Sequence, residues 1–83
     1  MSKQEDSLYQ MQTLRENLRF LRESHGWSRE KLSAHSGIPT EVLAVMEEGE
    51  DFAMEHLLTL GRLYEKEPVE FFVPMKDREP PLS

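Results

Sequence analysis

Residues 26–49 read GWSREKLSAHSGIPTEVLAVMEEG, and this stretch decides which fold the chain can adopt. Ser28 is a good N-cap, because its hydroxyl accepts one of the free N–H groups at the start of a helix. Trp27 and Leu32 stand on either side of that cap at the spacing of a hydrophobic staple, which fixes how a chain enters a helix. A helix is therefore predicted from about residue 29 to residue 36.

The next residues, Gly37, Ile38 and Pro39, predict a tight turn that ends this helix and starts another. Glycine adopts the left-handed conformation of a helix end at little cost, and proline is accepted in the first turn of a helix. The following helix is expected to end near Glu48, with Gly49 as its C-cap. Two helices joined by a short turn that contains glycine form the helix-turn-helix unit, whose second helix can lie in the major groove of DNA.

Apolar residues at helical spacing predict further helices on both sides of this unit. Leu14, Leu18 and Leu21 recur at the period of a helix that buries one face. A fourth helix is expected over about residues 54–64, and a short fifth helix over residues 68–72. The inward residues of the third and fourth helices are expected to be Leu43, Met46, Leu57, Leu60, Leu63 and Tyr64.

Three segments follow from this pattern. Residues 1–13 lack a clear apolar period, and we interpret them as a flexible N-terminal arm or as a frayed extension of the first helix. Residues 14–73 form the helical domain, and residues 74–83 form a Pro-rich, charged tail that is expected to be disordered. A chain of 83 residues is long enough for one small domain of this kind.

The composition excludes several classes of protein. No cysteine is present, so disulfides and thiolate metal sites are ruled out, and a reducing cytoplasm suits the chain. No apolar run approaches a membrane span or a signal peptide, which predicts a soluble, cytoplasmic protein. The three histidines share no ligand spacing, so neither a metal nor another cofactor is expected. No nucleophile–base arrangement or phosphate-binding glycine loop is apparent, and we do not expect an enzyme.

Negative charge is concentrated in the second half of the chain. The net charge is −6, with six Lys/Arg against five Asp/Glu in residues 1–36 and four against eleven in residues 37–83. Residues 32–61 contain six acids and neither lysine nor arginine, and they include the second helix of the predicted unit. Phosphate polyanions repel an acidic chain unless its cations gather on one face, so the composition alone disfavours nucleic acid.

A set of residues recurs in the order and with the gaps of a known family. They are Leu21, Arg22, Gly26, Trp27, Ser28, Leu32, Gly37, Ile38, Leu43, Met46, Glu47, Gly49, Leu57, Leu60, Phe71 and Phe72. In these residues the chain resembles the Cro/phage-repressor-like (XRE) helix-turn-helix family, over about residues 14–73. The resemblance implies an all-α, compact five-helix bundle that contains a helix-turn-helix, a lambda-repressor-like DNA-binding domain. It also implies a small, sequence-specific transcriptional regulator that binds double-stranded DNA as a homodimer on a two-fold site.

The same resemblance implies an ion pair between Arg22, late in the first helix, and Glu47, late in the third. A bidentate bond between guanidinium and carboxylate would fix the angle at which these two helices cross. Alternatively, both side chains are solvated charges on their own helices, which is the usual situation for arginine and glutamate.

The resemblance also assigns the residues that would touch DNA. Ser28, Arg29 and Lys31 would meet phosphates, since the N-terminus of a helix attracts anions. The residues that would face the base edges are Thr40, Glu41, Ala44 and Val45. Relatives usually carry Ser, Thr, Gln, Asn, Arg or Lys at such places, so this helix departs from the family pattern. With so few cations, weak binding and a shallow salt dependence are expected unless a dimer doubles the contacts.

A second function, from a different class, follows from the same departure. Val42 and Val45 widen the apolar surface of the third helix among Glu41, Glu48 and Glu50. This face could bind another protein, which would make the chain a protein-interaction module with little or no affinity for DNA. Alternatively, Val42 is half-buried and Val45 is a lone exposed apolar residue, which is common on protein surfaces.

The end of the predicted domain holds Phe71, Phe72 and Val73. Two adjacent aromatic residues on one short helix cannot both face inward, so one of them is expected at the surface. A symmetric dimer through this region is the natural use of such a surface. Alternatively, one ring covers the core under Trp27 or Tyr64.

Overall fold

The computed structural model describes residues 3–49 and 52–75, and all the regular structure in these two ranges is helical. The elements in chain order are α1 (Lys3–Ser24), α2 (Arg29–Ser36), α3 (Thr40–Glu48), α4 (Met54–Tyr64) and η1 (Pro68–Phe72). The predicted all-α class is confirmed, whereas the expected fifth helix is a short 3₁₀ helix and not an α-helix. None of the helices in these ranges combines the length and the apolar character needed to span a bilayer.

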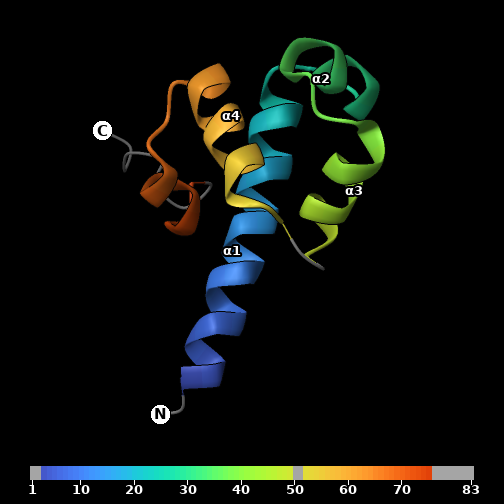
Figure 1. The fold of residues 1–83 in the computed structure, drawn as a ribbon. Coiled ribbons are helices and arrows are strands. Elements are labelled where there is room, and N and C mark those ends of the chain that lie inside the picture. Colours follow the sequence, from blue (N-terminus) through green and yellow to red (C-terminus); the bar gives the residue numbers. More distant parts are fainter. Residues whose placement is uncertain (1–2, 50–51, 76–83) are drawn as a thin grey trace, which may run out of the picture.

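Helix α1 is the long central element of the fold, and it begins before the predicted boundary. Residues 3–13, predicted as an arm, are the first half of this helix, so the alternative of a helical extension describes them. Figure 1 shows the N-terminal half of α1 extending past the other helices. Burial begins by Thr13, next to Leu14. The N-terminal part of α1 extends past the elements that cover the apolar face of the helix. Apolar residues therefore recur at helical spacing only after this part.

The turn between α2 and α3 forms as its residue types predict. The Ser28 hydroxyl accepts the N–H of Lys31 at 3.0 Å, which caps the start of α2. Gly37 has a φ of +81° and donates its N–H to the Ser33 carbonyl at 2.8 Å, which ends α2. The Pro39 carbonyl then accepts N–H groups from the first turn of α3. Both helices therefore have the bounds that the sequence predicted.

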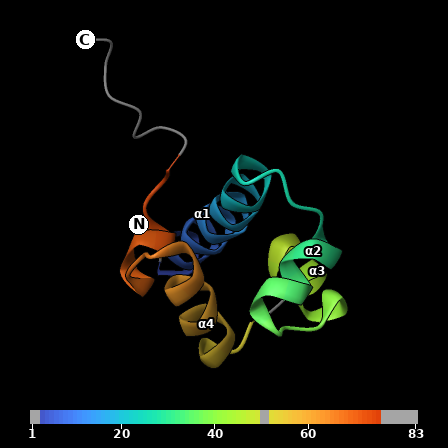
Figure 2. The ribbon, with the colours of Figure 1, turned by 90° about the horizontal axis from the view of Figure 1, so that it is seen from above.

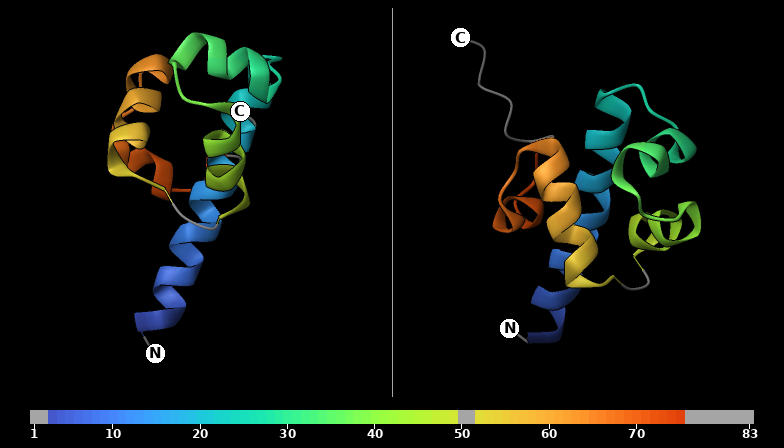
Figure 3. Two further views of the ribbon diagram at one scale, coloured as in Figure 1. Left: turned by 45° about the vertical axis from the view of Figure 1, so that its right-hand side comes forward. Right: turned by 45° about the horizontal axis from the view of Figure 1, so that its top comes forward.

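The hydrophobic core lies between α1 and the shorter elements. In Figure 1, α2 and α3 lie on one side of α1, and α4 and η1 lie on the other; Figures 2 and 3 show the same arrangement from other sides. Helix α1 packs against α3 and η1, and α2 packs against α3 and α4. The buried apolar residues are Leu14, Leu18, Leu21, Leu32, Ile38, Leu43, Met46, Leu57, Leu60, Tyr64, Phe71 and Met75. Helix α3 is thus held by two neighbours, and its remaining face is outward.

A buried asparagine on α1 fastens the last described residues to the core. Nδ2 of Asn17 donates to the carbonyls of Phe71 and Val73, at 2.7 and 2.9 Å, and Oδ1 accepts the N–H of Met75 at 3.0 Å. Met75 is buried, although the predicted tail begins at Pro74. The packed domain therefore extends to Met75, two residues beyond its predicted end, and the rest of the predicted tail lies outside the described residues.

The two phenylalanines of η1 are buried to different degrees, which corrects the predicted dimer face. Phe71 has 0% exposure, whereas Phe72 is half-buried and Val73 is 43% exposed. Gly61 on α4 lets the chain after this helix approach closely, because a β-carbon there would lie 2.8 Å from the Lys66 carbonyl oxygen. Phe71 therefore belongs to the core and is not available for a contact between two copies.

Candidate nucleic-acid interface

One face of α3 points away from the core, and it carries the residues predicted to read bases. The residues of α3 that face fully inward are Leu43, Met46 and Glu47. On the other side, Glu41 and Val45 are exposed, and Thr40 and Ala44 are half-buried. The four predicted residues therefore share one surface that a partner can reach.

The start of α2 carries the three predicted phosphate contacts, of which two have exposed side chains. Ser28 and Lys31 are exposed, whereas Arg29 is half-buried. A helix N-terminus attracts anions through its free N–H groups and its dipole, and Lys31 adds a positive charge within the first turn. The charge available here therefore depends on what binds Arg29.

The predicted pair between Arg22 and Glu47 is present. Nε of Arg22 donates to Oε2 of Glu47 at 2.7 Å, and Nη2 donates to Oε1 at 3.1 Å. The two side chains are 12% and 2% exposed, so the alternative of two solvated charges is wrong. The hydrogen bond to Glu47 raises the pKa of Arg22. Nη1 also donates to the Trp27 carbonyl at 2.8 Å, so one guanidinium joins α1, α3 and the segment that enters α2.

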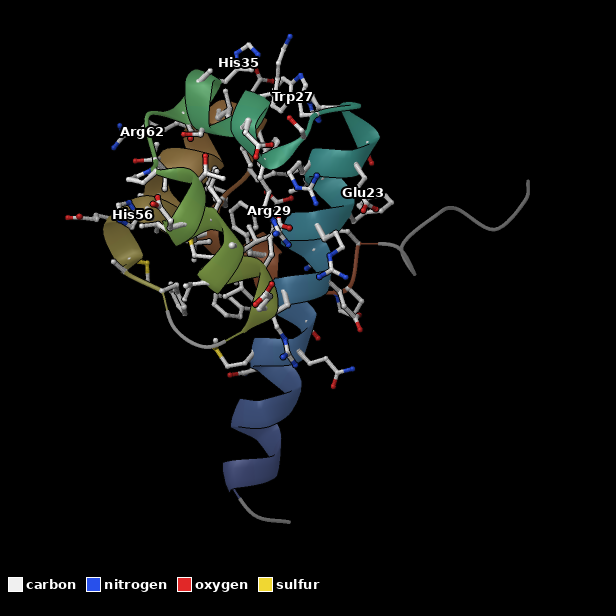
Figure 4. The ribbon with its side chains drawn as sticks, turned by 90° about the vertical axis from the view of Figure 1, so that its right-hand side faces the viewer. Glu23, Trp27, Arg29, His35, His56 and Arg62 are labelled. Carbon is white, nitrogen blue, oxygen red and sulfur yellow. The ribbon has the colours of Figure 1, made fainter. Side chains whose placement is uncertain are left out.

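Arg29 binds the same carboxylate, and nothing in the sequence indicated this contact. Nε of Arg29 donates to Oε1 of Glu47 at 3.1 Å, and Nη2 lies 4.0 Å from Oε2 of Glu48. The Arg29 side chain is 29% exposed, and Figure 4 shows it over the junction of α1 and α3. Two acids of α3 thus partly neutralise the predicted phosphate contact, and a phosphate has to compete with them.

Arg15 is also engaged, at the C-terminus of α3. Its Nη1 donates to the Glu48 carbonyl at 3.2 Å, where a positive charge is favoured by the helix dipole. An open cleft of about 320 Å³ lies here between α1 and α3. The residues that line it are Gln12, Arg15, Glu16, Arg19, Glu47 and Glu48. Among the cations near this surface, Arg19 and Lys31 are exposed and form no ion pair with any described residue.

Trp27 lies before the start of α2 in a cluster of rings. The His35 ring stacks on it with ring centroids 4.5 Å apart, and the centroid of the His25 ring lies 4.6 Å away. Tyr64 on α4 completes the cluster, 5.2 Å from His25. The Tyr64 hydroxyl is buried and has no hydrogen-bond partner among the described residues. Burial, with a smaller contribution from the charge of Glu47, raises the pKa of Tyr64 to about 12.

The surface formed by α2 and α3 offers hydrogen bonds and charge. Ser28, Lys31 and Thr40 can donate, whereas Glu41 and Glu48 can only accept when ionised. Within residues 3–49 and 52–75, no three His, Asp or Glu side chains gather as metal ligands do. Comparisons of the chain with protein-family models, with curated proteins and with solved structures found no match. The function is therefore inferred from the chemistry of this surface.

Proposed function

We propose that the chain is a small, sequence-specific DNA-binding regulator of the Cro/phage-repressor-like type, with α2, the turn and α3 as its helix-turn-helix. The observation that carries this proposal is the outward face of α3 from Thr40 to Val45, beside the exposed start of α2. A helix presented in this way can enter the major groove while the preceding helix meets the DNA backbone. The pair of Arg22 and Glu47 supports the same geometry, because it fixes α3 against α1.

The proposed contacts are of two kinds: contacts to phosphates position the domain on the duplex, and contacts to base edges read the sequence. Ser28, Lys31 and the free N–H groups at the start of α2 bind phosphates. Thr40 forms hydrogen bonds to base edges, and Glu41 accepts from the amino group of cytosine. Val45 contacts the methyl group of thymine. Such contacts can specify a sequence without help from a cation on α3.

The affinity is expected to be weak and sensitive to salt. Each phosphate that a cation neutralises steepens the fall of log K with log salt by about 0.9. Arg29 contributes only when it leaves Glu47 and Glu48, so a monomer gathers few such contacts. A homodimer on a two-fold site doubles them.

The proposed homodimer uses the end of the domain without Phe71. The surface there consists of half-buried Phe72 together with Val69 and Val73, which are 68% and 43% exposed. A symmetric contact through these side chains puts two copies of α3 in one assembly. Sedimentation equilibrium over a range of concentrations tests the contact, and a monomer mass at every concentration contradicts it.

Fluorescence anisotropy with a labelled, mixed-sequence duplex tests DNA binding at roughly 50 mM salt, where charge contacts are strong. The wild type should bind and should lose affinity as the salt concentration rises. Lys31→Ala should weaken binding and reduce the salt slope by about one. Arg62→Ala removes an exposed cation from α4 and should change neither quantity. Absence of wild-type binding, or equal effects of the two variants, contradicts the proposal.

A second candidate function is favoured by one observation, the binding of Arg29 to Glu47 and Glu48. Without the charge of Arg29, the outward face of α3 is acidic and apolar, with Val42 and Val45 among its residues. Such a face suits a basic partner protein and repels phosphates. In this case the scaffold is a protein-interaction module with little or no DNA affinity. The duplex titration separates the two functions, because only the first requires association that salt weakens.

A further inference from the structure

An apolar groove lies between the outward face of α3 and the beginning of α4. Its volume is about 390 Å³, and it is open to solvent. The residues that line it are Glu41, Val42, Val45, Phe52, Ala53 and His56. Figure 4 shows His56 on α4, beside α3. Because two valines, a phenylalanine and an alanine supply most of the lining, the groove offers apolar contact to an occupant.

Negative charge accompanies this groove. Glu41 lines it and has an exposed side chain. Glu55 is exposed in the first turn of α4. Among the described residues, neither of these two carboxylates forms an ion pair with a lysine or an arginine. An apolar surface bordered by carboxylates is complementary to apolar side chains flanked by lysine or arginine.

We propose that this groove binds a basic amphipathic helix of a partner protein. The proposal rests on the second candidate function, and it specifies the partner that this function requires. Apolar residues at i, i+3 or i+4, and i+7 of the partner helix fill the groove, and its flanking cations pair with Glu41 and Glu55. Under the second function a nucleic acid is disfavoured here, since the carboxylates repel its phosphates. A second copy of this chain brings its own net charge of −6 toward the same carboxylates.

The test uses two fluorescein-labelled helical peptides of about sixteen residues that differ only in charge. Both carry leucine at helical spacing on one face. One has lysine on the flanks of that face, and the other has glutamate at the same positions. Anisotropy titration with the full chain at roughly 50 mM salt should give about tenfold higher affinity for the lysine peptide. Equal affinities for the two peptides overturn the proposal.

Two pairs of matched variants locate the binding site. Val45 and Leu58 are both exposed, at 39% and 40%, but Val45 lines the groove and Leu58 does not. Val45→Asp should weaken binding of the lysine peptide about tenfold, and Leu58→Asp should change it less than about twofold. Glu41→Gln should weaken binding about threefold, whereas Glu23→Gln should leave it unchanged, because Figure 4 shows Glu23 far from His56. Equal effects within both pairs overturn the proposal.

Two measurements keep these outcomes interpretable. Far-UV circular dichroism should match the wild type for all four variants, since each changes an exposed side chain. If Val45→Asp alone fails to fold, the pair Glu41→Gln and Glu23→Gln decides.

Titration with the duplex separates the inference from the first function. Selectivity for the lysine peptide without duplex binding supports the inference and contradicts DNA binding. Duplex binding without this selectivity overturns the inference together with the second function, and it supports the first. Absence of both overturns the inference and leaves the second function with a partner of different chemistry.

Discussion

The guanidinium of Arg22 and the carboxylate of Glu47 join α1 to α3 through two hydrogen bonds, at 2.7 and 3.1 Å. The Glu47 side chain is 2% exposed and accepts a further hydrogen bond from Arg29. Because the carboxylate anchors the end of α3 against α1, it fixes the direction in which α3 turns its outward face. The same contact that orients this face therefore also removes a positive charge from its edge.

Arg22→Ala is expected to lower the free energy of unfolding by about 3–5 kcal/mol, because it removes the main partner of a buried carboxylate. Urea denaturation followed by Trp27 fluorescence measures the change. Arg19→Ala, three residues earlier on α1 and exposed, is the control and should stay within about 0.5 kcal/mol of the wild type. A denaturation curve for Arg22→Ala that coincides with the control would show that the ion pair adds no stability.

Replacing both charges should cost less than stranding one of them. The double variant Arg22→Met, Glu47→Leu removes the buried carboxylate together with its partner, so no uncompensated charge stays in the core. Its free energy of unfolding is expected to lie at least about 1 kcal/mol above that of Arg22→Ala. A double variant that is less stable than the single one would indicate that the shape of the pair, and not its charge, stabilises the junction.

Asn17→Ala is expected to destabilise the fold by about 2–4 kcal/mol, because the Phe71 and Val73 carbonyls and the Met75 N–H lose their buried partner. Asn17→Asp should cost at least as much, since an ionised carboxylate cannot donate to the two carbonyls. Amide hydrogen exchange should show that the Met75 N–H loses protection in Asn17→Ala, whereas Asn17→Asp keeps an oxygen that can accept it. Gln12→Ala, exposed on the same helix, is the control. Unchanged protection at Met75 in Asn17→Ala would refute the proposed anchoring.

Glu48→Gln is expected to strengthen duplex binding about threefold to tenfold, if the chain binds DNA as proposed. The change removes a carboxylate that is 56% exposed beside the DNA-facing surface and loosens its contact with Arg29. Arg29 stays bound to Glu47 at 3.1 Å, so the salt dependence of log K should steepen by less than the full 0.9 or so of a new phosphate contact. Stability should change by less than about 1 kcal/mol, because the contact is exposed and 4.0 Å long. Glu23→Gln on α1 is the control; equal affinities for the two variants would show that Glu48 does not face the duplex.

Tyr64 should give the stability a dependence on alkaline pH. Its folded-state pKa is raised to about 12 from an ordinary value of 10.0, so the unfolded chain ionises first. The stabilisation is complete below pH 10 and is lost as the pH rises toward 12, by roughly 2–3 kcal/mol in all. Denaturation of the wild type and Tyr64→Phe at several pH values isolates this contribution. At pH 7 the variant should be as stable as the wild type or more so, because the buried hydroxyl has no partner among the described residues. Parallel pH profiles for both proteins would contradict the raised pKa.

The sequence predicted the helices of residues 29–48 and the turn between them, because each signal acts over a few neighbouring residues. Ser28 caps α2 through an N–H three residues away, and Gly37 closes it through a carbonyl four residues back. The leucine period of α1 likewise needs only one helix to be recognised. Arg22 and Glu47 are 25 residues apart, so short-range sequence patterns could not predict that they form a pair. The resemblance to a family predicted it.

Which charges and rings face a partner was decided only by the tertiary structure. Arg29 binds an acid 18 residues away, and Asn17 binds carbonyls 54 and 56 residues away. The spacing of residues along one helix gives the side on which a residue lies, but not which atoms another helix places there. The sequence alone therefore determined where the chain turns and which helical faces are apolar. The packing of α2 against α3 brought Arg29 to Glu47 and Glu48 and partly neutralised it. The packing of η1 against α1 and α4 buried Phe71 completely and left Phe72 half-buried. Such groups are fixed by partners that only the folded chain brings together.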